Sequence, residues 1–445
     1  MPLQTIPSGT VQVDLATANT TYVLQTGDSI VSSADGINAG TLNSVSVFVY
    51  GTVLSGDDAI VDAIGNTGLT VVVGTGGQIT GNSDGISVYS TGATIVNYGQ
   101  VFGDDSGGIE LLDSGTVTTN RSSIENYGYV YGGDDGVFLS QSNADLYNSG
   151  TVSGDSGVFI VGSGCRVFNS GTITSTTPGA FAEAAIESGT AIYIENSGLL
   201  QGTRAVFGSN QSDTVVNSGS MVGTVELNDG DDTYLGREMG AAYDGVFGGI
   251  GNDYLQGSGA DDYFEGDGGQ DTLIGNAGAD SLSGGSNNDT LIGGDGDDTL
   301  AGGAADDKLK GGDQDDLLDG GNGNDTLIGG RGEDTLIGGS GQDSLTGGAD
   351  ADVFQFLSAS ETPASGSRDR ILDFELGVDL IDVSAIANFT FIGTAAFSLT
   401  PGELRLFESQ NGNTKVIMDI DGDGLNDAEI TVVGVHGLTA GDFVL

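Results

Sequence analysis

A period of nine residues runs without an insertion from residue 248 to residue 355. Each unit opens with Gly, carries Asp at its sixth place and has Leu or Phe at its eighth. A short glycine-rich turn joined to a strand too short to fold alone must stack on its neighbours to bury its one apolar side chain. The period therefore predicts a solenoid. The twelve units begin at Gly248, Gly257, Gly266, Gly275, Gly284, Gly293, Gly302, Gly311, Gly320, Gly329, Gly338 and Gly347.

The sixth place of every unit is an aspartate, which points to a metal. Glycine lets a turn backbone adopt left-handed conformations and aim its carbonyl groups inward, and Ca²⁺ prefers such oxygen ligands together with carboxylates. The predicted ligand aspartates are Asp253, Asp262, Asp271, Asp280, Asp289, Asp298, Asp307, Asp316, Asp325, Asp334, Asp343 and Asp352. The predicted turn glycines of the sites are Gly249, Gly251, Gly294, Gly296, Gly321, Gly323, Gly330, Gly332, Gly339 and Gly341.

The repeats resemble the RTX family of secreted calcium-binding proteins. Their signature, G-G-x-G-x-D-x-U-x, is matched by units such as GGDGDDTLA at 293–301. The resemblance implies a parallel β-roll with two units per turn, in which each ion lies between one loop and the loop two units on. Asp253 would then pair with Asp271, and so on to Asp334 with Asp352, giving about ten Ca²⁺ ions.

Some turn positions depart from the signature. The second glycine is replaced by Ser258, Asp267 and Asn276, and the fourth-place glycine by Ala260, Asn287, Ala305, Gln314 and Asp350. Asn and Asp tolerate left-handed backbone, whereas Ala and Gln do so poorly. Sites that use Ala260, Ala305 or Gln314 are therefore expected to be the weakest.

Residues 356–445 read as short strands and resemble another known module. The matching pieces are DRILDFELGVDLIDVSAI at 369–386, DIDGDGLNDAEI at 419–430 and LTAGDFVL at the end. They are similar to the C-terminal module of serralysin-type metalloproteases and to the repeat modules of mannuronan C5-epimerases. The resemblance implies a small β module with an uncleaved type I secretion signal, for which 442–445 is the candidate.

Calcium and export belong to one mechanism in this interpretation. Low cytosolic calcium would leave the acidic repeats unfolded for passage through the type I secretion machinery, and calcium outside the cell would fold them. The predicted localisation is secreted, extracellular or at the cell surface.

Asp419, Asp421 and Asp423 form a second calcium candidate, because D-x-D-x-D-G opens an EF-hand loop. The twelfth place of that loop is Ile430, where a bidentate Glu is needed. An acidic hairpin turn between two strands is the favoured alternative.

Residues 1–226 carry a different repeat, in which Asn-x-Gly recurs and is followed by a short strand. Its members are Asn97, Asn126, Asn148, Asn169, Asn196 and Asn217. Coils of this length with a stacked Asn at a bend predict a parallel β-helix of about eight coils. Residues 227–247 are interpreted as a connection with one stray unit, so the whole chain is expected to be all-β, with a β-helix, a β-roll and a small β secretion module.

Two sets of residues in the β-helix have alternative interpretations. Aromatic residues at like places either stack in the core, which is favoured, or form an outward sugar-binding face. Acids after the second strand of a coil are interpreted as solvated turns rather than a metal row. The aromatic residues are Tyr98, Phe102, Tyr127, Tyr131, Phe138 and Phe159, and the acids are Asp57, Asp84, Asp104, Asp105, Asp134, Asp135 and Asp155.

Composition limits the function. With 63 acidic and 11 basic residues the formal charge is −52, which disfavours nucleic acid and anionic membranes as partners. No stretch approaches a transmembrane span. The lone Cys165 cannot form an internal disulfide, and a buried residue is favoured over a reactive thiol.

Three functions remain open. A non-catalytic structural or adhesive protein of the cell surface or matrix is favoured, with self-association or a cell-surface glycan as partners. A uronate lyase or epimerase is the first alternative, but residues 1–247 contain no His and no Lys, and their four arginines do not cluster in the sequence. A glycan-binding protein without catalysis is the second.

Overall fold

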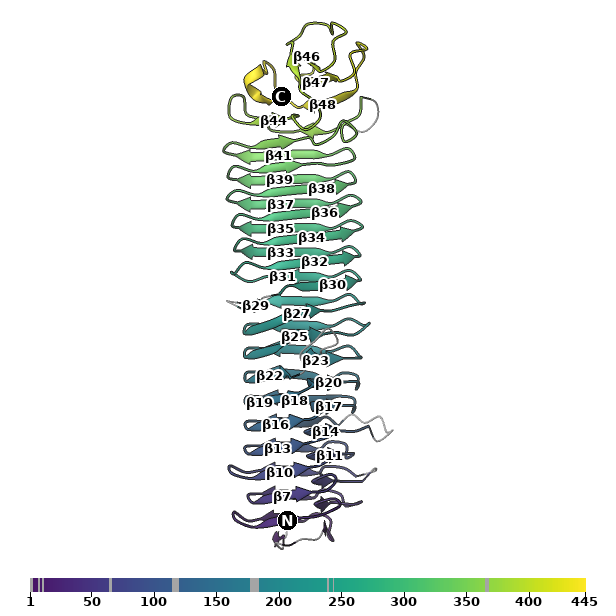
Figure 1. Ribbon diagram of the computed structural model, residues 1–445, viewed down its shortest axis with the longest axis vertical. Helices are drawn as coiled ribbons and strands as arrows, with labels where there is room; N and C mark the ends of the chain where they lie inside the picture. Colours follow the sequence, from purple (N-terminus) through teal and green to yellow (C-terminus); the bar gives the residue numbers. More distant parts are fainter. Residues whose placement is uncertain are drawn as a thin grey trace. The chain divides into compact units, whose positions relative to one another are not determined.

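A computed structural model describes residues 3–6, 9, 12–63, 66–113, 120–176, 184–237, 240–242, 244–364 and 368–445. The chain folds as two units, Met1–Phe247 and Gly248–Leu445. Most of each unit is built from short parallel strands stacked coil upon coil (Figure 1). The fold is all-β and solenoidal, as the two sequence repeats predict, and the nonapeptide repeats lie in the C-terminal half.

The first sheet of the N-terminal unit, called sheet A, takes one strand from each coil, and all neighbouring strands are parallel. Its strands are β1 (Leu3–Thr5), β3 (Thr21–Leu24), β6 (Ser46–Val49), β9 (Thr70–Val73), β12 (Thr94–Asn97), β15 (Ser122–Asn126), β18 (Ala144–Asn148), β21 (Arg166–Asn169), β24 (Tyr193–Asn196), β26 (Thr214–Asn217) and β28 (Thr233–Gly236).

The remaining strands form sheet B, which has two parallel ladders. The first contains β4 (Ser29–Val31), β7 (Thr52–Ser55), β10 (Gln78–Gly81), β13 (Gln100–Gly103), β16 (Tyr129–Gly132), β19 (Thr151–Gly154) and β22 (Thr172–Ser175). The second contains β2 (Val13–Asp14), β5 (Ile37–Asn38), β8 (Ile60–Val61), β11 (Ile86–Val88), β14 (Ile109–Leu111), β17 (Asp135–Leu139), β20 (Ser156–Ile160) and β23 (Ala184–Ser188). Both ladders run into β25 (Leu199–Phe207), which pairs with β27 (Ser220–Glu226), and β29 (Ala241–Ala242) follows.

The core of this unit follows from the alternation of side chains along each strand. Val, Ile and Leu at the inward places are fully buried, as at Ile95, Ile124 and Leu146 in successive coils. The predicted Asn column is confirmed: each amide donates to the next carbonyl oxygen along the ladder, with Nδ2–Oδ1 distances of 2.8 to 2.9 Å from Asn97 to Asn217. These side chains are buried, so the stack satisfies polar groups that have no access to water.

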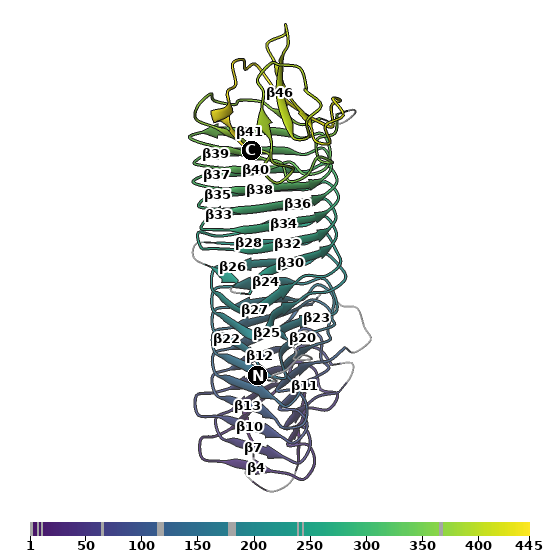
Figure 2. The ribbon, with the colours of Figure 1, turned by 45° about the horizontal axis from the view of Figure 1, so that its top comes forward.

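The C-terminal unit begins inside β30 (Val246–Ile250) and continues as a roll with two faces. One face contains β31 (Tyr254–Gln256), β33 (Thr272–Ala277), β35 (Thr290–Asp295), β37 (Lys308–Asp313), β39 (Thr326–Arg331), β41 (Ser344–Ala349) and β43 (Arg370–Ile371). The other contains β32 (Tyr263–Gly268), β34 (Ser281–Ser286), β36 (Thr299–Ala304), β38 (Leu317–Asn322), β40 (Thr335–Ile337), β42 (Val353–Gln355) and β44 (Leu380–Asp382). Figure 2 shows β33, β35, β37 and β39 along one side and β34, β36 and β38 along the other.

Each strand of the roll pairs in parallel with the strand two units on, for example Leu273 with Leu291 and Leu282 with Leu300. The eighth-place residues point inward and are at most 1% exposed. One turn of the roll therefore contains two nonapeptide units, because a single unit supplies only one of the two faces.

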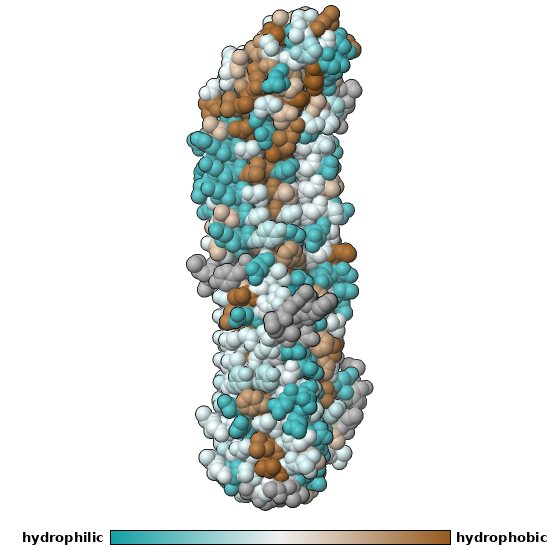
Figure 3. All heavy atoms as spheres, viewed as in Figure 1, coloured by the Kyte–Doolittle hydropathy of each residue, from teal (hydrophilic) through white to brown (hydrophobic). Residues whose placement is uncertain are grey.

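The roll ends in a small antiparallel sheet of β46 (Glu403–Glu408), β47 (Thr414–Asp419) and β48 (Ala428–Val432), with β45 (Thr390–Phe391) beside β46. A 3-10 turn, η1 (Ala440–Asp442), leads into β49 (Phe443–Val444), which pairs with β44. Apolar residues gather on the surface of this last part (Figure 3), where Leu399 and Leu425 are 67% and 65% exposed.

Candidate calcium sites

The repeat aspartates form two columns along the roll, one beside each face. Each aspartate is at most 4% exposed, and from Asp271 to Asp352 Oδ1 accepts the backbone N–H of the aspartate two units before it. The N–O distances lie between 2.8 and 3.1 Å from the pair Asp253–Asp271 to the pair Asp334–Asp352. The structure thus brings the predicted partner loops together, two units apart.

In ten of the twelve repeat aspartates the second carboxylate oxygen has no protein partner. Oδ2 is buried and without a hydrogen bond in Asp271, Asp280, Asp289, Asp298, Asp307, Asp316, Asp325, Asp334, Asp343 and Asp352. A buried charged oxygen without a partner is costly, and native structures leave such groups unsatisfied only for a reason such as a missing ion. A row of these oxygens at one coil spacing fits a row of bound cations.

The first glycine of each unit makes room for that oxygen. A Cβ at Gly275 would lie 2.0 Å from Oδ2 of Asp280, and a Cβ at Gly293 would lie 2.1 Å from Oδ2 of Asp298. Both distances are far inside van der Waals contact, so any side chain here would displace the carboxylate. Only glycine at this position therefore leaves the space between the turn backbone and the carboxylate free.

The turn glycines have the left-handed backbone that the sequence predicts. All ten predicted turn glycines have positive φ, from 85° at Gly339 to 152° at Gly341. A Cβ at Gly269 or Gly341 would lie 1.5 Å from a carbonyl oxygen of the turn one coil before. Carbonyl oxygens and carboxylate oxygens are the hard ligands that Ca²⁺ prefers, so the donors present fit calcium.

Burial raises the pKa of these carboxyls. It raises the pKa of Asp271 and Asp334 to about 6, and the pKa of Asp280, Asp289, Asp316, Asp325 and Asp352 to about 7, with neighbouring acids adding to the effect. Without cations the roll therefore resists full ionisation near neutral pH. A bound cation supplies the opposite charge that reverses this shift.

The departures from the repeat signature behave in two ways. Asp267, Asn276, Asn287, Ala305, Gln314 and Asp350 all adopt left-handed φ, between 69° and 88°. Ala305 and Gln314 therefore carry a strain of about 1–2 kcal/mol each. Ser258 and Ala260 are not left-handed, and the Ser258 N–H donates to Oδ2 of Asp262 at 2.8 Å. That bond competes with a cation for the same oxygen.

Comparison with known proteins agrees with this geometry. A family model described as RTX calcium-binding nonapeptide repeat (4 copies) matches residues 246–273, 265–300, 283–318, 292–327 and 319–354. Residues 246–354 are thus RTX calcium-binding nonapeptide repeats. RTX nonapeptide repeats bind calcium, so the repeat unit of this chain is a calcium-binding roll.

One solved structure to which part of this chain is similar is the AlgE6R3 subunit from the Azotobacter vinelandii mannuronan C5-epimerase. It is 34% identical, and the match covers 32% of this chain and 80% of that one with a TM-score of 0.28. No curated protein matches the chain.

Two aspartates that the repeat period does not include extend the RTX columns. Asp343 donates its N–H to Oδ1 of Asp369 at 3.0 Å, and Asp352 donates to Oδ1 of Asp379 at 3.1 Å. Oδ2 of Asp369 is buried and has no hydrogen-bond partner. Burial raises the pKa of Asp369 and of Asp343. The signal in the sequence is an aspartate with a large apolar residue two places later. It occurs as Asp369-Arg370-Ile371 and Asp379-Leu380-Ile381, where the repeats have Asp-x-Leu or Asp-x-Phe.

The EF-hand candidate lies in a hairpin turn between β47 and β48. Ligand atoms of Asp419, Asp421 and Asp423 lie within 4.8 Å of one another. Both oxygens of Asp419 already accept backbone N–H groups, from Gly422 at 2.8 Å and Gly424 at 2.9 Å. These bonds are those of a tight acidic turn flanked by strands, which favours the turn interpretation.

The prediction for the aromatic residues of the N-terminal unit is wrong. Tyr98 and Tyr127 are 47% and 50% exposed and stack on each other outside the solenoid, with ring centroids 4.9 Å apart. Phe102, Tyr131, Phe138 and Phe159 are half-buried. Each tyrosine directly follows an inward Asn, so strand alternation turns it outward.

The other predictions for this unit fare better. Asp57, Asp104, Asp105 and Asp134 are exposed, as solvated turns require, whereas Asp84 is buried and accepts the Gly107 N–H and the Ser87 hydroxyl. Cys165 is buried, and burial raises the pKa of its thiol to about 11. Over the part of the chain that the structure describes, no helix is long and apolar enough to cross a membrane.

Proposed function

We propose that this protein is an extracellular structural or adhesive protein whose C-terminal roll folds when about ten Ca²⁺ ions enter its aspartate columns. The proposed ligands are the twelve repeat aspartates and the ten turn glycines named above. The row of buried Oδ2 atoms without partners carries the proposal, because these oxygens need cations in the folded state. Ten Ca²⁺ ions supply a charge of +20 against the formal charge of −52.

Because the roll needs calcium to fold, its folding depends on the calcium concentration of the compartment in which it lies. At the low calcium of the cytosol the carboxylates repel one another and the roll is unstable, and outside the cell mass action stabilises it. We therefore propose export by a type I system with the signal in the last residues, and residence at the cell surface or in the matrix. The proposed division of the chain is 1–226, 227–247, 248–355 and 356–445.

A non-catalytic role is supported by the side chains of the N-terminal unit. Uronate chemistry needs a base and cations that bind a substrate carboxylate. Arg121 and Arg166 do meet, but both are bound to Asp145. Arg204 is paired with Glu226, and residues 1–247 have no Lys or His to supply a neutral base.

The test is a calcium titration of the purified full-length protein. We expect a cooperative gain of β-structure by circular dichroism between chelator and about 10 mM Ca²⁺, with no comparable effect of Mg²⁺. Sedimentation in the same samples reports assembly, which a structural role predicts. A fully folded roll in chelator at pH 8 would contradict the proposal.

A further inference from the structure

The outward face of sheet A from β12 to β26 has a composition unlike the rest of this acidic chain. Strand register sorts its outward side chains into three columns that follow the stacked coils. One column is aromatic and then serine, a second mixes hydroxyl, acidic, basic and aromatic residues, and the third mixes valine, glutamate and aromatic residues. The columns are Thr94, Ser123, Asp145, Arg166, Tyr193 and Thr214; Val96, Glu125, Tyr147, Phe168, Glu195 and Val216; and Tyr98, Tyr127, Ser149, Ser170, Ser197 and Ser218.

Aromatic rings on this face are exposed and held in place by stacking. Tyr147 is 40% exposed and stacks on Phe168 with centroids 4.9 Å apart and an interplanar angle of 6°. Tyr98 and Tyr127 form a second stack. The place after Tyr127 in its column is Ser149, so no ring covers that side of Tyr127. Fixed rings with open surface are amphipathic anchors that lose little entropy on binding.

A groove lies where the aromatic column gives way to serine. Its volume is about 170 Å³, and the residues that line it include Tyr147, Phe168, Glu195 and the three serines Ser149, Ser170 and Ser197. All three serines are exposed. A volume equal to about six liquid waters admits one small polar ring rather than a whole drug-sized ligand. A larger ligand would have to extend beyond the groove along the face.

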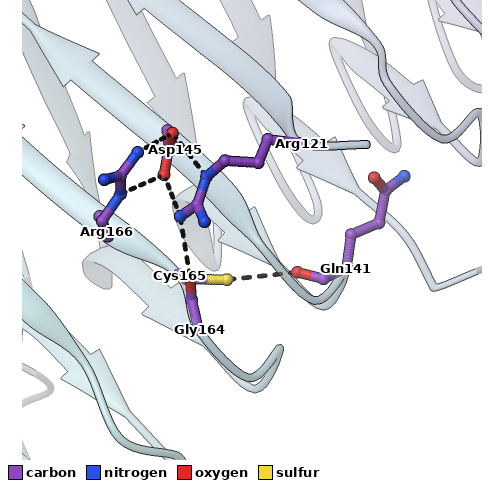
Figure 4. Close-up of polar contacts among 6 residues, drawn as sticks. All are labelled: Arg121, Gln141, Asp145, Gly164, Cys165 and Arg166. Carbon is purple, nitrogen blue, oxygen red and sulfur yellow. Dashed lines mark hydrogen bonds and ion pairs between the residues drawn. The ribbon is translucent and has the colours of Figure 1, made fainter. Parts of the chain in front are cut away.

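The charges on this face are balanced. Arg121 and Arg166 both bind the Asp145 carboxylate, at 2.6 Å each, and Arg121 also donates to the Gly164 carbonyl (Figure 4). Glu125 and Glu195 accept the hydroxyls of Tyr127 and Tyr193. With Arg237 at the far end of the serine column, the face carries three acids and three arginines.

We propose that this face of sheet A binds a neutral polysaccharide, one sugar ring of which lies in the groove beside Tyr147 and Phe168. The apolar C–H side of a sugar ring packs on the aromatic rings, and its hydroxyls bond to Ser149, Ser170, Ser197 and the Glu195 carboxylate. The inference goes beyond the proposed calcium function, since it concerns the unit that has no RTX repeats.

Charge selects the class of ligand. An anionic polysaccharide would meet a chain of charge −52, and Arg121 and Arg166 are already bound to the Asp145 carboxylate. The core of a protein–protein interface that excludes water is depleted of charged residues. The three columns of this face instead mix aromatic side chains with hydroxyl and carboxylate groups. A neutral polyhydroxyl ligand satisfies both the rings and the polar groups.

The test uses the full-length protein in calcium and isothermal titration with oligosaccharides of neutral glucan, xylan, mannan and galactan, with alginate and polygalacturonate as acidic arms. We expect at least one neutral series to bind and the acidic arms not to bind. Tyr147→Ala and Ser170→Gln should each weaken binding about tenfold or more, through loss of ring contact and through filling of the groove. Tyr254→Ala, at a tyrosine of similar exposure in the other unit, should leave affinity unchanged.

Circular dichroism of each variant verifies folding, because both residues are on the surface and their replacement should not unfold the coil. Failure of every neutral series at millimolar concentration overturns the proposal. So does preferred binding of an acidic glycan, or binding that survives both variants. Self-association that Ser170→Gln abolishes would instead make this face a contact between two copies of the chain.

Discussion

The replacement of Asp325 by Asn distinguishes two effects of the buried carboxylates. One is the binding of cations, and the other is the cost of ionising a buried acid when no cation is bound. Oδ1 of Asp325 accepts the Asp307 N–H at 2.8 Å, and its Oδ2 is buried without a partner. Asn keeps the acceptor but puts an amide where a cation ligand is expected. Because Asp325 lies between Asp307 and Asp343 in its column, the change removes a ligand from two adjacent sites.

With calcium the variant should be less stable. At ten times the dissociation constant each site contributes about 1.4 kcal/mol, so losing two lowers the free energy of unfolding by about 3 kcal/mol. Without calcium the sign should reverse. Burial raises the pKa of Asp325 to about 7, so ionising it at pH 8 costs the folded state up to about 4 kcal/mol, and Asn does not ionise.

The assay compares the wild type, Asp325→Asn and the control Asp297→Asn by urea unfolding in 10 mM Ca²⁺. In chelator at pH 8, where the roll is unstable, it compares the β-structure that each protein retains, measured by circular dichroism. Asp297 is the exposed fifth-place neighbour in another unit, and its replacement removes the same charge. We expect the control to match the wild type in both conditions. Equal destabilisation of Asp325→Asn with and without calcium would refute the argument, because it would mean a structural role without cation binding.

Four further predictions follow from the same geometry. In chelator, the β-structure of the roll should increase as the pH falls from 8 to 5. The pKa values of these carboxyls in the folded state, about 6 to 7, exceed the ordinary 3.8, so the folded state binds more protons and its stability falls as the pH rises. Circular dichroism against pH checks this, and a flat profile contradicts it. Gly293→Ala should lower the number of bound Ca²⁺ ions measured by equilibrium dialysis, since its Cβ would lie 2.1 Å from Oδ2 of Asp298, whereas Gly268→Ala has room and should not. Ala305→Gly should raise the free energy of unfolding in calcium by up to about 1 kcal/mol, as relief of left-handed strain exceeds the entropic cost of glycine; a loss of stability would count against strain at this turn. Asp369→Asn should reduce the ion count by about one, measured by native mass spectrometry, although residue 369 lies outside the nonapeptide run; an unchanged count would limit the metal columns to the repeats.

The sequence predicts the roll well because its period is strict. A unit of nine with one inward residue defines both the strand and the turn, and pairing two units on places Asp253 against Asp271. Asp369 and Asp379 were not predicted because the coil that contains them is longer. The hydrogen bonds that extend the columns to them join residues 26 and 27 positions apart, whereas those within the repeats join residues 18 positions apart.

The structure of the N-terminal unit is harder to predict from the sequence because its coils differ in length. The Asn column identifies one bend, and the stack of Asn97 on Asn126 confirms it. To predict which way an aromatic side chain points, one must know whether it lies an odd or an even number of residues from that bend. Tyr98 is one residue past an inward Asn and so points outward, which a count of like places along the coil does not reveal.

The most direct test of the calcium account is a crystal structure grown in Ca²⁺, with anomalous scattering used to locate the ions. The account predicts an ion beside Oδ2 of each repeat aspartate that now lacks a partner, and one beside Asp369. Columns that hold no cation, with the Oδ2 atoms bonded to protein groups instead, would contradict it.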